Sequence, residues 1–202
     1  MTLRREEVAL SSLLLLVASA TFVYGSWLYN KSFWQGKSTP AFAAWAVFSV
    51  VTLVNVLTYL QWTAEWVNVA VLLTDCVICI GTTAIVFVRL KGKVRVDKVD
   101  QAIVCLSLTA VGIWVVFGTA GVGNWLNQFA YNFAFVPTYR NAIRDPKQEP
   151  TRPWAIWTFA FVLNIVALAI KPETQFMDYV APGVSLVDHV AITLLSLRKT
   201  HK

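Results

Sequence analysis

Seven long apolar segments alternate with short polar ones along the chain. Each apolar segment is close to the roughly 20 residues that an α-helix needs to cross a bilayer. The segments between them hold the charged, proline and glycine residues typical of loops. The apolar segments cover residues 8–30, 41–60, 66–88, 101–118, 122–140, 154–170 and 177–197. The pattern therefore predicts an all-α, polytopic membrane protein with seven transmembrane helices.

The composition agrees with a membrane protein and excludes several other classes. Of the 202 residues, 57% are hydrophobic and 14% are charged, whereas soluble domains are about 45–50% apolar and about a quarter charged. The nine Trp, 12 Phe and six Tyr residues argue against a disordered chain, and three cysteines cannot form a disulfide scaffold. The net charge of +6 is explained by membrane orientation, so we expect no nucleic-acid partner.

Basic residues are concentrated on one side of the predicted topology. Only Arg4, Arg5 and Lys171 fall on the side of the N-terminus, and the other 14 of the 17 Lys and Arg residues fall on the opposite side. Because cytoplasmic loops carry the basic excess, we predict an external N-terminus, a cytoplasmic C-terminus and a plasma (inner) membrane location. The first apolar segment has the leucine run of a signal peptide, but it continues past Ala20, so we expect it to be retained.

The second half of the chain repeats the first. A shift of 112 residues places Thr39, Ala43, Trp45, Val50 and Val54 on the identical residues Thr151, Ala155, Trp157, Val162 and Val166. A shift of 113 places Asp75 on Asp188. The predicted organisation is a three-helix bundle in residues 1–90, a linker helix in 91–120 and a second three-helix bundle in 121–202. The unmatched linker helix restores the direction of the second bundle, so the two repeats are parallel.

This 3+1+3 plan resembles the SWEET and PQ-loop superfamily of membrane proteins, and is closest to uncharacterised members of that fold. The motif likeness rests on Pro137-Thr138 at the place of the PQ-loop dipeptide, followed by Arg140-Asn141, Asp145-Pro146, Glu149, Trp154 and Trp157. The chain departs from the family pattern in having no Pro-Gln dipeptide, and Gly25 replaces the first-repeat proline. The resemblance implies the fold and leaves the solute open.

Two aspartates lie in the middle of predicted membrane spans. Asp75 is about ten residues into its span, or ~15 Å at 1.5 Å per residue, and Asp188 lies at the matching depth of the last span. A charged side chain there costs at least ~2.5–3.5 kcal/mol and usually faces a bundle interior or a water-filled cavity. We therefore predict that both aspartates line a central cavity. The alternative is that each is a structural residue held by a hydrogen bond between helices.

The resemblance also implies roles for the residues around these aspartates. In SWEET-like carriers the third helix of each repeat contributes a polar residue to the pocket, and Asp75 and Asp188 match these positions. The second helix of each repeat adds a residue that flanks the substrate, and Thr52 and Asn164 match those. Aspartate favours proton coupling or a cationic group on the solute over a neutral sugar as sole substrate. His189 is a candidate proton relay, with a hydrogen-bonded packing role as the alternative.

Two residues are predicted hinges and two more are candidate solute contacts. Pro137 removes a backbone hydrogen bond and Gly25 is pliable, as alternating access requires, although membrane helices also tolerate both residues without moving. Polar residues in the fifth span recur at helical spacing and share one face. Among them we predict that Gln128 and Tyr131 line the substrate pocket, with packing between helices as the alternative.

The sequence contains no enzyme motif. Cys76 and Cys79 lack the second ligand pair of a zinc site, and neither a phosphate loop nor a nucleophile motif is present, so we predict no enzyme activity, cofactor or metal. The predicted function is secondary transport of a small polar solute by alternating access, with proton coupling through the two aspartates. The alternative is a non-transporting receptor, sorting protein or complex subunit on the same fold. The expected partners are the lipid bilayer and a small-molecule solute. The sequence leaves open whether the chain forms a homo-oligomer.

Overall fold

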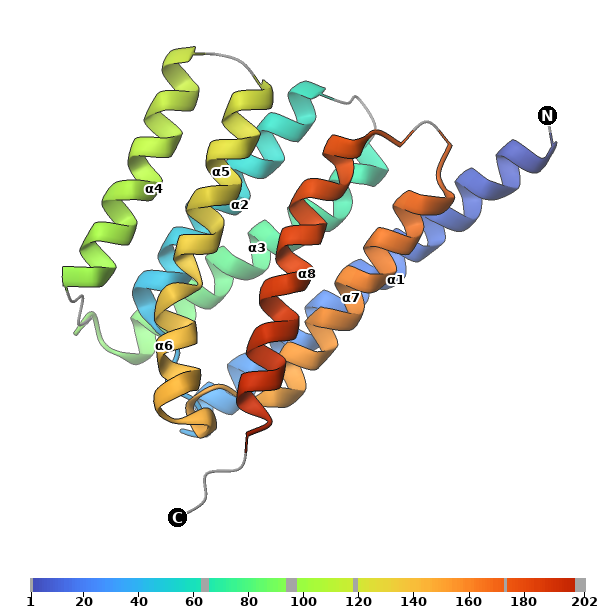
Figure 1. Cartoon of the computed structure of the whole chain (residues 1–202). Coiled ribbons are helices and arrows are strands. Elements are labelled where there is room, and N and C mark those ends of the chain that lie inside the picture. Colours follow the sequence, from blue (N-terminus) through green and yellow to red (C-terminus); the bar gives the residue numbers. More distant parts are fainter. Residues whose placement is uncertain (1, 63–65, 94–97, 118–119, 173, 199–202) are drawn as a thin grey trace.

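The computed structural model of the chain describes residues 2–62, 66–93, 98–117, 120–172 and 174–198, and within these ranges every regular element is a helix (Figure 1). Five of the described helices are long and apolar enough to cross a membrane, namely α1 (Thr2–Trp34), α2 (Phe42–Trp62), α3 (Trp66–Arg89), α7 (Thr151–Ile170) and α8 (Phe176–Ser196). The others are α4 (Lys98–Phe117), α5 (Ala120–Ala134), α6 (Val136–Arg144) and the 3₁₀ turn η1 (Pro146–Gln148). The chain is a helical membrane protein.

Helices occupy all seven predicted apolar segments, but five of the described helices are long and apolar enough to span a membrane, so the count of seven spans stays a prediction. The differences lie in the fourth and fifth segments. The segment 122–140 is not one helix, because α5 ends at Ala134 and α6 begins at Val136. Pro137 is in the first turn of α6. Its missing N–H is tolerated there because the backbone N–H groups of a first turn have no carbonyl acceptor within the helix. In α4 the apolar part, Val104–Phe117, is shorter than the predicted span.

Helices that are distant in the sequence lie side by side. α3 packs against both α1 and α2, and α8 packs against α7 and also against α5 and α6. Between the N-terminal helices α1–α3 and the C-terminal helices α5–α8, α1 packs extensively against α7, and α2 packs against α5. α4 lies at the edge of the bundle next to α5, and the N- and C-terminal ends of the chain lie at opposite ends of the molecule (Figure 1).

The outer faces of the helices are apolar. Large hydrophobic side chains are exposed on α1, α3, α5, α7 and α8, including Leu13, Leu16, Val77, Phe129, Phe159, Val187 and Leu194. A soluble monomer rarely exposes so much contiguous apolar surface. This surface is suited to contact with lipid tails.

The contact between α1 and α7 depends on a glycine. Gly25 is buried in α1, and a Cβ atom built on it would lie 2.7 Å from Nε1 and 2.8 Å from Cδ1 of Trp157 on α7. The close approach lets the Trp157 Nε1–H donate to the carbonyl of Phe22, one turn before Gly25, at 3.2 Å. A second hydrogen bond joins α1 and α7 at the other end of their contact, where the Ser11 hydroxyl donates to the carbonyl of Ala167 at 2.9 Å.

Gly25→Ala is expected to lower the free energy of unfolding by about 1–3 kcal/mol, the usual cost of overpacking a tight core. The new methyl group would displace the buried indole of Trp157 and lengthen its bond to Phe22. The measurement is thermal unfolding of the detergent-solubilised protein. Gly183→Ala in α8 is the matched control, because nothing lies within 4 Å of a Cβ at that position. Equal melting temperatures for the two variants would contradict the proposed contact.

Candidate functional site

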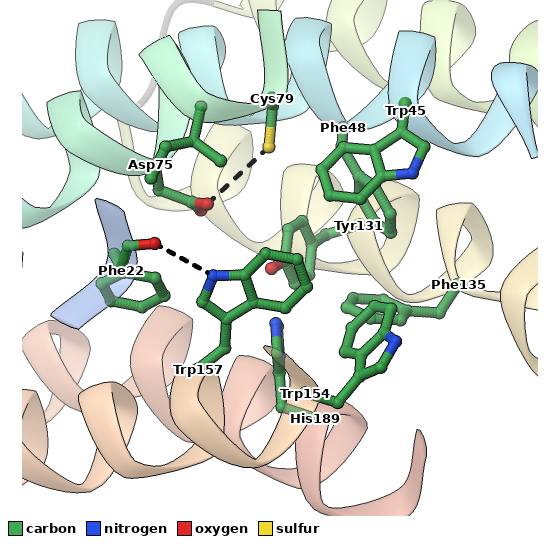
Figure 2. A pocket seen from close by; sticks show the side chains of 11 residues that line it. Phe22, Trp45, Phe48, Asp75, Cys79, Tyr131, Phe135, Trp154, Trp157 and His189 are labelled. Atoms are coloured by element: carbon green, nitrogen blue, oxygen red, sulfur yellow. Dashed lines mark hydrogen bonds between the residues drawn. The ribbon is translucent and has the colours of Figure 1, made fainter. Parts of the chain in front are cut away.

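A small cavity lies in the interior of the bundle, between helices from both ends of the sequence (Figure 2). Its volume of about 20 Å³ accommodates a single water molecule. Phe22 comes from α1, and Trp154 and Trp157 come from α7. The remaining lining residues are Trp45, Phe48, Asp75, Ile78, Cys79, Tyr131, Phe135 and His189. The cavity is therefore mostly aromatic, with one carboxylate in its wall.

That carboxylate is Asp75, one of the two aspartates that the sequence places at mid-span. It is partly buried on α3, and the Cys79 thiol, one turn further along the helix, donates to its Oδ1 at 3.7 Å. In Figure 2 the carboxylate points toward the centre of the aromatic group. A thiol is a weak donor, so the protein gives this carboxylate little hydrogen bonding.

The indole N–H groups of the three cavity tryptophans all donate to acceptors elsewhere. Trp45 donates to the hydroxyl of Tyr29 at 3.4 Å, and Trp154 donates to Glu149 Oε2 at 3.1 Å. Trp157 donates to the carbonyl of Phe22 at 3.2 Å. The tryptophans therefore present ring carbon to the cavity and no free N–H.

His189 lies on α8 against the cavity aromatics. Its Nδ1 is 2.7 Å from the carbonyl of Ser185, and because a carbonyl can only accept, Nδ1 carries a proton. The neutral ring then has Nε2 as an acceptor. The imidazole meets Phe135 edge to face, with ring centroids 5.4 Å apart. Tyr131 of α5 also lines this wall, and its hydroxyl lies within hydrogen-bonding reach of Ser185.

The second mid-span aspartate lies outside the cavity lining. Asp188 is 5% exposed, and its Oδ1 accepts a 2.7 Å hydrogen bond from the Tyr139 hydroxyl on α6. Its Oδ2 is buried and has no hydrogen-bond partner. On α8 the residue that faces the cavity is the next one, His189. The structure thus brings Asp75, Tyr131 and His189 together and places Asp188 beside them, bonded to α6.

The other predicted solute contacts are buried between helices and do not line the cavity. The Thr52 hydroxyl donates to the carbonyl of Phe48 in its own helix at 2.7 Å, and Asn164 is buried in α7. Gln128 Nε2 donates to Asn55 Oδ1 at 3.1 Å, and Asn127 Nδ2 also donates to Asn55. The polar face of the fifth span therefore divides, with Asn127 and Gln128 bonding to α2 and Tyr131 lining the cavity.

The two predicted hinges differ in local structure. The helix is interrupted at Phe135, two residues before Pro137, while α1 continues as a helix through Gly25. Gly25 is a point of close helix contact, as described above. Motion at either residue stays a prediction.

Glu149 is a further candidate functional residue, which the sequence indicates only through its place in the PQ-loop-like motif. Glu149 lies in the loop between α6 and α7, yet it is 1% exposed. Its Oε2 accepts hydrogen bonds from the Tyr29 hydroxyl at 3.3 Å and from the Trp154 indole at 3.1 Å, and its Oε1 is buried without a partner. The signal in the sequence is weak, because both donors lie in other elements and one is distant in sequence. Glu149 also lines a wide surface hollow with Lys147, Thr151 and Arg198, so it lies between that hollow and the cavity tryptophans.

Burial raises the pKa of Glu149 to about 8, against the opposing effect of the hydrogen bonds from Trp154 and Tyr29 and of the nearby Asn141 side chain. The group therefore takes up a proton near neutral pH, whereas an exposed glutamate is ionised there. Protonation at Oε1 would change the bonds that join α1 to α7. Within the described ranges, no three His, Cys, Asp or Glu side chains gather in a group that could hold a metal ion.

Glu149→Gln should flatten the dependence of stability on pH. A carboxyl with a raised pKa stabilises the folded protein below the unfolded value of 4.5, and this contribution is lost as pH rises to about 8. The wild-type free energy of unfolding should therefore fall, relative to the variant, by up to about 1.4 kcal/mol per pH unit in that window. Thermal unfolding in detergent at pH 5, 7 and 9 measures this. Tyr29→Phe, which keeps the carboxyl, should retain the slope, and parallel profiles for wild type and Glu149→Gln would contradict the assignment.

Comparison of the chain with protein-family models, with curated proteins and with solved structures found no match.

Proposed function

We propose that the chain is a seven-helix secondary transporter that moves a small polar solute by alternating access. In this proposal residues 1–90 and 121–202 form two three-helix bundles that move relative to one another, and residues 91–120 link them. The solute site is the aromatic cavity at Asp75. Proton coupling through Asp75, Asp188 and His189 forms part of the proposal.

The pairing of helices supports two equivalent bundles. Under the shift of about 112 residues, α1 corresponds to α5 with α6, α2 to α7, and α3 to α8. α3 contacts both other helices of the first bundle, and α8 contacts both partners in the second. The same shift converts the contact between α1 and α7 into a contact between α5 and α2, and the structure contains both contacts. This exchange is what a twofold axis along the membrane normal requires.

The observation that carries the proposal is the composition of the cavity wall. Both bundles contribute to it, with Phe22, Trp45 and Asp75 from the first and Tyr131, Trp157 and His189 from the second. None of the described residues of α4 lines the cavity, as expected of a linker. A charged group at mid-span between two repeats is the usual location of a transporter site.

Two hydrogen-bonded contacts between the bundles, at opposite ends, fit the gates that alternating access needs. At one end Glu149 accepts from Tyr29 of α1. At the other end the hydroxyl of Tyr59, near the end of α2, donates to Asp178 in the first turn of α8. Opening the cavity to one side requires one contact to break while the other holds. Both contacts are formed in the structure.

The decisive experiment is flux in proteoliposomes under a pH gradient. Asp75→Asn and Asp188→Asn keep the size and hydrogen bonding of the side chain but remove its titration. Either change should abolish pH-driven uptake while some equilibrium exchange of solute remains. The matched control is Asp145→Asn, because Asp145 lies in the α6–α7 loop and accepts only a local bond from the Lys147 N–H.

Wild-type pH dependence in both variants would remove proton coupling and leave a facilitator. The absence of flux for every solute tested, in a folded protein, would instead favour the receptor or subunit function on the same fold.

The proposed orientation has its own test. Single cysteines at Lys93 and Lys147, in a chain whose three native cysteines are replaced by serine, should react with a membrane-impermeant maleimide only from the cytoplasmic side. A cysteine at Gln175 should react only from outside. All three positions are exposed in the structure. Labelling of all three from one side would overturn the seven-span topology and the repeat together.

A further inference from the structure

We infer that the cavity binds a protonated primary amine, so that the transported solute carries an ammonium group. This inference rests on the proposed function and names the substrate class of the same site. It is argued from the charge, the hydrogen-bonding groups, the aromatic rings and the volume of the cavity.

The charge of the wall favours a cation. Among the described residues that line the cavity, Asp75 is the one acidic side chain and none is Lys or Arg. The Cys79 thiol is its hydrogen-bond donor, at 3.7 Å. A carboxylate at mid-span is costly without a compensating charge. A cationic solute supplies that charge, while an anionic solute would add repulsion.

The hydrogen-bonding groups of the wall are short of donors. The indole N–H groups of Trp45, Trp154 and Trp157 are bonded to Tyr29, Glu149 and Phe22. What faces the cavity is the Asp75 carboxylate and the acceptor nitrogen of His189, with the Tyr131 hydroxyl between them (Figure 2). Acceptors pair with an N–H-rich ligand, and an ammonium group has three donors and no acceptor. A sugar would leave its own acceptor oxygens without partners, which is costly in a buried site.

The aromatic rings of the lining also favour a cation. The ring centroid of Trp157 lies 6.1 Å from that of Trp45 and 5.0 Å from that of Trp154. Phe22, Phe48 and Phe135 also line the cavity. Aromatic faces attract a cation through their quadrupoles, and tryptophan does so most strongly. The attraction is larger for a desolvated cation than for one at an exposed site.

The volume selects among cations. About 20 Å³ holds one water-sized group, and an –NH₃⁺ head is of that size. A trimethylammonium head is larger and has no N–H to offer Asp75 or His189. The site is therefore expected to prefer the head group of a primary ammonium.

The test is isothermal titration calorimetry on the full chain in detergent, at constant pH and ionic strength. Ethylammonium should bind saturably. Ethanol, a neutral analogue of similar size, and acetate, an anion, should bind at least about tenfold more weakly, and so should tetramethylammonium. Asp75→Asn should weaken ethylammonium binding about tenfold or more, while Asp145→Asn should bind as the wild type does.

Equal binding of ethanol and ethylammonium by the unmutated protein would overturn the inference, whatever the variants do. Unchanged ethylammonium binding in a folded Asp75→Asn protein would also overturn it. Its failure is distinguishable from failure of the transport proposal. Flux of a neutral solute without ethylammonium binding rejects the inference alone, and Asp75-dependent binding of ethylammonium without flux of any amine rejects transport alone.

Discussion

The close contact between Gly25 of α1 and Trp157 of α7 is the constraint on which the rest of the interior depends. With no side chain at Gly25, the indole of Trp157 reaches the backbone of α1 and donates its N–H to Phe22. This bond joins the first and second halves of the chain across the bundle. It also removes a donor from the cavity, so that the wall beside Asp75 is ring carbon. Helix packing and the chemistry of the site are in this way set by one contact.

The two halves are similar in packing but not in chemistry. The shift that relates them pairs Asp75 with Asp188, yet Asp75 lines the cavity and Asp188 bonds to Tyr139 outside it. The break before Pro137 separates α5, which carries Tyr131, from α6, which carries Tyr139. The second aspartate is therefore bonded to a different helix from the one that carries Tyr131. This asymmetry gives the two carboxylates different surroundings.

Most of the fold could be predicted from the sequence, because the signal for a membrane helix is local. About 20 consecutive apolar residues are enough to indicate a span, and the observed ends of α2, α3 and α8 lie within two residues of the predicted ones. The break at Phe135 was not predicted as the end of a helix, although Pro137 was named as a hinge. A proline kinks some membrane helices and interrupts others, and neighbouring helices decide between the two outcomes.

The sequence by itself determined which residues are chemically unusual, since an aspartate in an apolar run is improbable wherever the run packs. It did not determine which of them share a cavity. Successive residues of a helix point about 100° apart, so a small rotation of α8 decides whether Asp188 or His189 faces inward, and only packing against α7, α5 and α6 sets that rotation. The burial of Glu149 also depends on tertiary packing. Its donors Tyr29 and Trp154 belong to α1 and α7, and a loop carboxylate becomes an interior group only where tertiary structure brings those helices together.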